Sequence, residues 1–332
     1  MGTVLSGIRP TGDLHLGHWV GALRNWISLQ EEHTCYFTIV DWHALAGEGY
    51  RKSKGMAARI RDMAAGFIAA GVDTERATFF VQSHVKEHAE LHLLLSMITP
   101  TPWLLRNPAV KDQARELGLI ADEGEITKID YGYLGYPVLQ AADILLYDTD
   151  VVPVGEDQLP HLELTREIVR RFNHLFGPTF KEPAARLTPT PRLLGLDNRK
   201  MSKSYDNCIF LFEDGKSVEK KVKKMITDAD KVRLGDPGHP EVCTVFSYHK
   251  TFNAEEVPQL EADCRSGALP CGTCKVNLAG KLNEVLTPLR DRKKEIDAQP
   301  ERIDALLEEG AVRARAVAAA TLQRAKKAAG LA

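Results

Sequence analysis

Short β-branched or aromatic runs alternate with longer helical patterns over the first two-thirds of the chain, and this alternation constrains the fold most. The candidate strands are Thr3–Ser6, Cys35–Val40, Ala77–Gln82, Val151–Val154 and Cys208–Phe212. Helical patterns lie at about residues 18–30, 53–70, 87–98, 137–147 and 159–172. That order predicts an α/β fold, in which helices cover both faces of a parallel sheet. Ligands of such sheets bind at the carboxyl ends of the strands.

The β-signal fades after about residue 215, which divides the 332-residue chain into two expected domains. Residues 1–214 are predicted to form a Rossmann-type nucleotide-binding domain, with a helical excursion near 183–189. Residues 215–332 are predicted to form an all-helical domain. No apolar run reaches the roughly 18–20 residues of a membrane span, and the first residues lack an export-signal pattern. We therefore expect a cytoplasmic protein with no membrane partner.

A first motif, SGIRPTGDLHLGH, spans residues 6–18 and joins a strand to a helix. Gly17 has no side chain, so a flat ligand can approach the backbone there. The start of the helix offers unpaired N–H groups to phosphate. His15 and His18 can donate hydrogen bonds to phosphate oxygens without a permanent charge. Taken alone, two histidines at the start of a helix are more often structural than functional.

A second motif, KMSKS, occupies residues 200–204 and follows the turn GLDNR at 195–199. Lys200 and Lys203 could hold the triphosphate of ATP, because two flexible ammonium groups can follow a moving pyrophosphate. A lone K-x-x-K more often marks a solvated basic loop. The full pentapeptide, about 180 residues after HLGH, reverses those odds.

The pair HLGH and KMSKS resembles the signature of class I aminoacyl-tRNA synthetases, and the compact length is similar to their tryptophanyl and tyrosyl subgroup. The resemblance covers essentially the whole chain. It implies a homodimer whose partners are ATP with Mg²⁺, an amino acid and a tRNA. His15, His18, Lys200 and Lys203 would be catalytic. The ATP-binding residues that the resemblance implies are Arg9, Pro10, Thr11, Gly17, His18, Gly155, Glu156, Asp157, Leu193, Lys200, Met201, Ser202, Lys203 and Ser204.

The segment YPVLQAADILLY, residues 136–147, contains the candidate amino-acid pocket. Tyr136, Gln140 and Asp143 share one face if the segment is a helix, and that face could bind an aromatic amino acid. A buried carboxylate at Asp143 can accept a hydrogen bond from an indole N–H or from a phenol O–H. The residue types therefore leave tryptophan and tyrosine open, and the pattern also resembles archaeal-type tyrosyl enzymes.

Residues 152–173 (VPVGEDQLPHLELTREIVRRFN) are similar to the bacterial tryptophanyl pattern, as are VDWHA at 40–44 and GAL at 21–23. The resemblance implies L-tryptophan and tRNA(Trp) as substrates, with a tyrosyl enzyme as the alternative. It implies that Asp143 binds the indole N–H, and that His43, Val152 and Val154 line the pocket. Gln158 and residues 155–157 would border the amine and the nucleotide.

Two positions depart from that pattern. Many bacterial tryptophanyl enzymes have Gln where this chain has Arg9, and Met where it has Gln140. The departure implies rearranged contacts to the amine and carboxylate, with Arg9 able to hold the substrate carboxylate or a phosphate. Lys111 stands where related enzymes have a mobile basic residue for ATP.

Four of the six cysteines, Cys243, Cys264, Cys271 and Cys274, are separated by 20, 6 and 2 residues. In a cytosolic chain such a cluster suits metal ligands better than disulfides. Four thiolates can hold a tetrahedral zinc ion or a [4Fe–4S] cluster. Some tryptophanyl enzymes carry a similar motif whose first gap is two residues longer, and this resemblance implies a [4Fe–4S] cluster with a structural role. Zinc is the alternative.

The net charge of −2 argues against a general nucleic-acid coat protein but allows a local basic patch. The expected tRNA phosphate contacts are Lys220, Lys221, Lys223, Lys224, Arg292, Lys293 and Lys294. A non-catalytic RNA-binding paralogue is one rival, although such a chain would usually lose HLGH, GEDQ or KMSKS. A small-molecule adenylyltransferase is another, but it would lack KMSKS and the helical domain.

Overall fold

The computed structural model describes residues 2–187 and 193–332, and a parallel sheet lies at its centre. Its five strands are β1 (Thr3–Ile8), β2 (Thr34–Ile39), β3 (Thr78–Val81), β4 (Val151–Val154) and β5 (Ala184–Leu187), in the order β3-β2-β1-β4-β5. In β1, Val4 lies opposite Cys35 of β2 and Val151 of β4. The strand order reverses between β1 and β4, which is where ligands of such sheets bind. The predicted α/β fold is confirmed.

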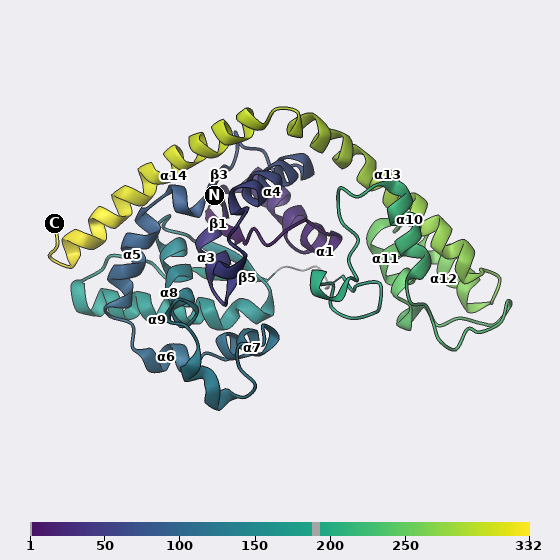
Figure 1. Ribbon diagram of the computed structural model, residues 1–332, viewed down its shortest axis with the longest axis horizontal. Coiled ribbons are helices and arrows are strands. Elements are labelled where there is room, and N and C mark those ends of the chain that lie inside the picture. Colours follow the sequence, from purple (N-terminus) through teal and green to yellow (C-terminus); the bar gives the residue numbers. More distant parts are fainter. Residues whose placement is uncertain (1, 188–192) are drawn as a thin grey trace.

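Helices cover both faces of this sheet and form a second lobe (Figure 1). Between α1 and α2 the helix widens into a π-helical stretch, η1 (Trp19–Leu23). None of the described helices combines the length and the apolar character that a membrane crossing requires. The helices are α1 (Leu16–His18), α2 (Arg24–Glu32), α3 (Asp41–Leu45), α4 (Met56–Ala70), α5 (Glu87–Ser96), α6 (Thr101–Arg106), α7 (Pro108–Glu116), α8 (Tyr131–Leu145), α9 (Leu159–Phe176), α10 (Gly215–Lys224), α11 (Thr244–Phe252), α12 (Val257–Arg265), α13 (Cys271–Asp297) and α14 (Pro300–Ala328).

Two expectations about the sheet are wrong. Residues 208–212 form no strand: only Phe210 makes an isolated bridge, with His15. Their apolar pattern reflects burial instead, because Cys208, Ile209 and Leu211 pack into the core. The fifth strand comes from residues 184–187, where a helical excursion was expected. This short strand is mostly exposed, so it carries no apolar signal, and pairing with β4 holds it in place.

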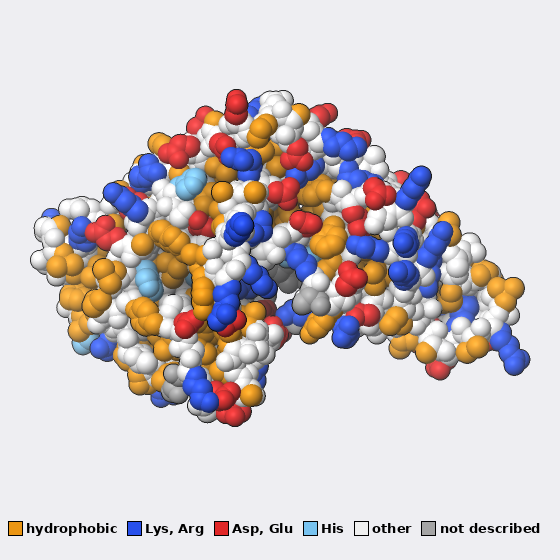
Figure 2. Space-filling model, viewed as in Figure 1, with side chains coloured by type: hydrophobic (Ala, Val, Ile, Leu, Met, Phe, Trp, Pro, Cys, Tyr) orange, Lys and Arg blue, Asp and Glu red, His pale blue; other side chains and the backbone are white. Residues whose placement is uncertain are grey.

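The long helix α14 leaves the helical lobe and lies along the edge strand β3 (Figure 1). A Cβ atom at Gly310 would lie 1.7 Å from the carbonyl oxygen of Phe79, so only glycine permits this contact. Arg313 donates to the carbonyl oxygens of Thr74 and Ala77 beside it. Part of the segment expected to form a separate helical domain therefore covers the open edge of the sheet. The face shown in Figure 2 is hollowed between the two lobes.

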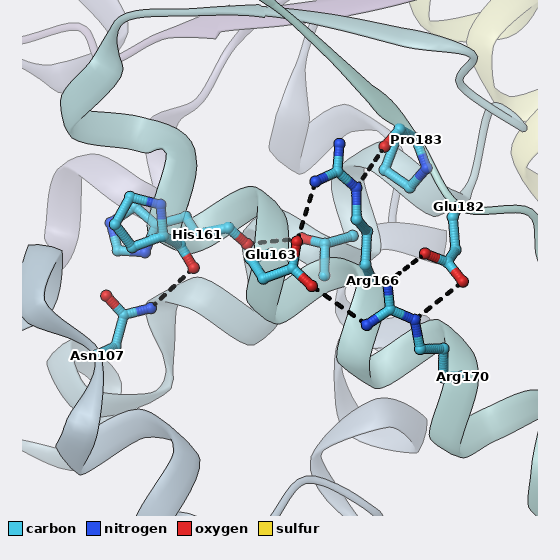
Figure 3. Close-up of polar contacts among 9 residues, drawn as sticks. Asn107, His161, Glu163, Arg166, Arg170, Glu182 and Pro183 are labelled. Atoms are coloured by element: carbon cyan, nitrogen blue, oxygen red, sulfur yellow. Dashed lines mark hydrogen bonds and ion pairs between the residues drawn. The ribbon is translucent and has the colours of Figure 1, made fainter.

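Ion pairs on the outer side of α9 fasten this helix to the segment that leads into β5 (Figure 3). Arg166 and Arg170 both bind Glu163, and Arg170 binds Glu182 through two hydrogen bonds of 3.0 and 2.7 Å. Arg166 also donates to the carbonyl oxygen of Pro183 at 2.9 Å. Exposed pairs of this kind add little stability singly. Together they hold α9 in place, and the first turn of this helix contains His161, which lines the cavity at the strand ends.

Candidate active site

A cavity of about 340 Å³ lies at the carboxyl ends of β1 and β4, beside the point where the strand order reverses. Its volume suits a small molecule. Nine of the residues predicted to bind substrate or nucleotide line it: Arg9, His43, Tyr136, Gln140, Asp143, Val152, Val154, Gly155 and Gln158. The structure therefore brings these side chains to one place, while their roles in binding stay predictions.

Asp143, on α8, is the buried carboxylate of this cavity and is 3% exposed. It accepts hydrogen bonds from His43 Nε2 at 3.0 Å, from His88 Nδ1 at 2.6 Å and from Gln82 Nε2 at 2.8 and 2.9 Å. Burial raises the pKa of Asp143, but the charges and hydrogen bonds of His88 and His43 outweigh it and hold this pKa below its ordinary range. Asp143 is therefore an ionised acceptor at neutral pH.

A second buried layer holds Asp143 from behind. His88 is fully buried, and its Nε2 atom lies 2.8 Å from the hydroxyl oxygen of Tyr147. Nδ1 donates to the Asp143 carboxylate, and Nε2 contacts the tyrosine hydroxyl on the other side of the ring. Burial raises the pKa of Tyr147 well above its ordinary value, which keeps this hydroxyl protonated. The orientation of the carboxylate is thus fixed by groups that do not line the cavity.

On the wall beside Asp143, the hydroxyl oxygen of Tyr136 lies 2.9 Å from Nε2 of His161, the histidine at the start of α9. Burial lowers the pKa of His161 to about 4, so this imidazole is neutral at physiological pH. Burial also raises the pKa of Tyr136. This wall therefore presents neutral hydrogen-bonding groups, in contrast to the charged Asp143.

The HLGH and KMSKS motifs meet although they are about 180 residues apart. The rings of His15 and His18 stack with their centroids 3.6 Å apart, and Lys203 Nζ donates to the carbonyl oxygen of Thr11 at 3.2 Å. Burial, and then the charge of Lys203, lowers the pKa of His15 to about 4. Burial, and then the nearby His15 and Lys203, lower the pKa of His18. Both histidines are therefore neutral hydrogen-bonding groups beside one ammonium group.

The start of α1 is less open to a ligand than the motif suggests. The N–H of Leu16 donates to the carbonyl oxygen of Ile209 at 2.9 Å, and that of Gly17 lies 3.3 Å from the sulfur of Met201. The expectation of unpaired N–H groups at these two positions is wrong in this structure. The close approach that Gly17 permits is made by the KMSKS loop itself.

The other predicted ATP-binding residues lie in different surroundings. Lys200 is exposed, and its Nζ atom lies 3.6 Å from Glu116 Oε1. Leu193 packs into the hydrophobic core. Pro10 is buried, Thr11, Glu156 and Asp157 are exposed, and Ser202 is half-buried. The side chain of Ser204 lies outside the described part of the chain. Lys111 lies on α7, whose Gln113 lines the cavity.

The four clustered cysteines come together where α11, α12 and α13 begin or end. All four are free thiols. Burial, and then the nearby Cys243, Cys264 and Cys271, raise the pKa of Cys274 to about 12. Among the described residues, one set of three candidate metal-ligand atoms lies within 4.8 Å of one another: those of Asp228, Asp230 and His239. The four thiols lie close enough to influence one another electrostatically.

Two of the lysines expected to contact tRNA are engaged within the protein. Lys293 is 7% exposed, and its Nζ atom binds Asp62 at 2.8 Å and Asp297 at 2.7 Å. Lys221 binds Glu213 at 2.6 Å. The expectation for Lys293 is wrong, because its ammonium group joins α13 to α4. Lys220, Lys223 and Lys224 are exposed on α10.

Sequence reasoning missed the groups that position the site. Gln82 and His88 bind Asp143, Tyr147 binds His88, His161 binds Tyr136, and Asn207 lies inside the KMSKS loop. One signal was available: Gln82 directly follows β3, and ligand-binding groups gather at the ends of parallel strands.

Comparison with known proteins agrees with this geometry. A family model described as "tRNA synthetases class I (W and Y)" matches residues 2–287. A tryptophan–tRNA ligase of Thermotoga maritima is 45% identical over 328 residues, and one of Aquifex aeolicus is 43% identical over 390; each alignment covers 98% of both chains. The structure of tryptophanyl-tRNA synthetase from Campylobacter jejuni, complexed with ADP and tryptophan, matches with a TM-score of 0.88 at 33% identity. It covers 99% of this chain and 100% of that chain.

The parallel sheet, the paired motifs and the cavity at the strand ends define a class I aminoacyl-tRNA synthetase. Within that class, the chain belongs to the tryptophanyl-tRNA synthetases of the bacterial type, which are tryptophan–tRNA ligases.

Proposed function

We propose that the chain activates L-tryptophan with Mg·ATP to give tryptophanyl-AMP and pyrophosphate. It then transfers the tryptophanyl group to the 2′-hydroxyl of the 3′-terminal adenosine of tRNA(Trp). One observation carries this proposal: the cavity with the ionised Asp143 ends at Arg9, and two residues further on Thr11 contacts Lys203. An amino-acid site and a phosphate site thus adjoin along one loop. A cytoplasmic location follows from this activity.

Asp143 is proposed to accept the indole N–H. A side chain of similar shape without that N–H would lose this hydrogen bond, and sites that hydrogen-bond a polar group of the substrate reject analogues lacking that group by about 10⁴-fold. Val152 and Val154 offer apolar contact to the ring system from β4. Arg9 and Gln158 line the same cavity and are the candidates for the substrate's carboxylate and amine.

In the first step, a carboxylate oxygen of tryptophan attacks the α-phosphorus in line, and the bond from that phosphorus to the pyrophosphate oxygen breaks. The carboxylate is already ionised at neutral pH, so the step requires no general base. Positioning and charge stabilisation are the remaining contributions. His15 and His18 are proposed to hydrogen-bond phosphate oxygens as neutral rings, while Lys200 and Lys203 stabilise the departing pyrophosphate.

The proposal is tested by ATP–pyrophosphate exchange with tryptophan and with tyrosine in parallel, followed by charging of tRNA(Trp). Exchange with tryptophan alone is the expected result. Exchange with tyrosine alone would assign the Tyr136–Gln140–Asp143 face to a phenol. Exchange with neither amino acid, in folded protein, would contradict an enzyme and favour a non-catalytic paralogue.

We propose that tRNA contacts the helical lobe through Lys220, Lys223 and Lys224. Lys and Arg side chains gather over this lobe on the face shown in Figure 2, and these three are exposed on α10. Replacing all three with alanine is expected to raise KM for tRNA and to leave tryptophan-dependent exchange unchanged. If the triple variant and the wild type charged tRNA equally well at several salt concentrations, these lysines would not form the tRNA contact.

We further propose a homodimer. Leu93 on α5, Met97 directly after this helix and Tyr131 at the start of α8 are 58%, 71% and 73% exposed. Large apolar groups on two packed helices are typical of an interface. Sedimentation is expected to show a dimer for the wild-type chain, and Met97→Glu is expected to shift it toward monomer. A monomeric wild type would contradict this proposal.

We propose that Cys243, Cys264, Cys271 and Cys274 hold a [4Fe–4S] cluster, with zinc as the alternative. The resemblance of the cysteine spacing to that of tryptophanyl enzymes with an iron–sulfur motif favours the cluster. Either group would crosslink α11, α12 and α13. Iron, sulfide and zinc analysis of anaerobically purified protein decides between the two.

A further inference from the structure

The side chain of Asn207 lies inside the loop that carries the KMSKS motif, and it is 2% exposed. Its Oδ1 atom accepts from the N–H of Ser202 at 2.8 Å. Its Nδ2 group donates to Asp197 Oδ1 at 2.7 Å and to the carbonyl oxygen of Lys200 at 3.1 Å. One amide therefore hydrogen-bonds three groups of the loop, and two of these, the N–H of Ser202 and the carbonyl oxygen of Lys200, belong to the residues that flank Met201.

The backbone around this amide leaves no room for another arrangement. A Cβ atom at Gly195 would lie 2.2 Å from Asn207 Nδ2, so the loop can close around the amide only because residue 195 is glycine. The N–H of Leu196 donates to the carbonyl oxygen of Asn207 at 3.0 Å, and that of Gly195 to Arg199 at 2.7 Å. The first and last parts of the loop are thus joined through Asn207.

We propose that Asn207 is a positioning residue for adenylate formation, which aims Lys203 by fixing the peptide groups of Lys200 and Ser202. Within the described part of the chain, the Lys203 ammonium group makes one hydrogen bond, to the Thr11 carbonyl oxygen, so its place depends on the backbone that carries it. This inference rests on the proposed role of Lys203 in stabilising pyrophosphate. Asn207 itself contacts none of the residues that line the amino-acid cavity through the hydrogen bonds described here.

Asparagine suits this place because it offers a donor and an acceptor on one short planar group. Asn207→Asp keeps the shape and the acceptor for Ser202, but it removes the donor and sets a carboxylate against Asp197. Displacements of about 1 Å in such sites cost up to about 10²-fold in rate. We expect Asn207→Asp to lower the rate of tryptophan-dependent exchange by about 10–100-fold and to raise KM for ATP, with KM for tryptophan unchanged.

Two further variants separate positioning from a loss of folding. Asp206→Asn alters the exposed neighbour, whose left-handed backbone (φ 49°) asparagine also adopts, and it is expected to behave as wild type. The double change Asp197→Asn with Asn207→Asp restores the hydrogen bond between the two side chains, because the amide at position 197 can then donate to the carboxylate at position 207. We expect the double variant to recover at least half of the decrease in the logarithm of the exchange rate that Asn207→Asp causes.

The decisive measurement is a double-mutant cycle of Asn207→Asp with Lys203→Ala. If Asn207 acts through Lys203, adding Asn207→Asp to Lys203→Ala lowers exchange by less than about threefold. If the two substitutions lowered the exchange rate additively, the positioning role of Asn207 would be wrong, while the role of Lys203 would stand. The same conclusion would follow if Asn207→Asp had a normal exchange rate and Lys203→Ala did not. An unimpaired Lys203→Ala would overturn the proposed function of the lysine and this inference with it.

Discussion

The amino-acid cavity and the KMSKS loop differ in how they hold their charges. Asp143 is 3% exposed and accepts from three side chains, one of which is held in turn by Tyr147. Lys200 is exposed, and Lys203 donates to the backbone carbonyl group of Thr11. A fixed, buried charge can select a ligand by the hydrogen bond that the ligand adds, whereas a loosely held ammonium group can follow phosphate oxygens as they separate. The rigid cavity is thus suited to selecting the amino acid, and the less firmly held KMSKS loop is suited to assisting the transfer of phosphate groups.

The largest effect is expected from neutralising the fixed charge. Asp143→Asn leaves buried donors of His88 and His43 without a carboxylate, which should lower kcat/KM for tryptophan by about 10³-fold and unfolding free energy by about 3–5 kcal/mol. Pyrophosphate exchange and urea unfolding measure the two effects. Asp148→Asn, near the end of the same helix and 40% exposed, is the control. Normal tryptophan use by Asp143→Asn would show that the cavity selects its ligand elsewhere.

The loosely held charge is tested by Lys203→Ala. Loss of one group that stabilises developing charge costs about 10²–10³-fold in rate, so exchange should fall by that factor with stability nearly unchanged. Lys54→Ala, an exposed lysine distant in sequence, serves as the matched control. A rate within a few-fold of wild type would remove Lys203 from the mechanism.

Acidification should act through the buried histidines of both regions. The pKa values of His15 and His161 are lowered to about 4, mainly by burial, whereas unfolded histidine titrates near 6.5. Between about pH 6.5 and 4 the unfolded chain binds more protons, so unfolding free energy should fall by about 1–3 kcal/mol as pH decreases. Urea unfolding at several pH values tests this.

His161→Gln should flatten that dependence, and His174→Gln, exposed on the same helix, should not. An identical pH dependence in His161→Gln and wild type would mean that other groups are responsible.

The smallest effect concerns the ion pair between Lys200 and Glu116, both largely exposed. Such pairs contribute about 0–1 kcal/mol. Glu116→Gln should free Lys200 and lower KM for ATP by about twofold or less, measured by exchange at low and high salt. A tenfold change would show that Lys200 is held as firmly as Asp143.

Sequence patterns predicted the parallel sheet because β1 to β4 are buried, β-branched or aromatic runs. They failed at β5, an exposed edge strand whose place depends on pairing with β4. The motif residues His15, His18 and Lys203 were identified together, and the structure joins them. His88 and Asn207 escaped notice because their importance lies in side-chain contacts across 55 and 5–10 positions of the chain, which the residue patterns do not encode. Gln82, which contacts Asp143 across 61 positions, was marked only by its place directly after β3.

The contact of Gly310 with Phe79 has a consequence for biosynthesis. β3 is synthesised early, but α14, the helix that covers its open edge and contains residue 310, is synthesised much later. The edge can be covered only after α14 has emerged from the ribosome. Until α14 is made, the nascent sheet therefore exposes unpaired backbone groups, which favour association with other chains. Protection of the growing chain by a chaperone during this interval is therefore most important at the edge strand β3.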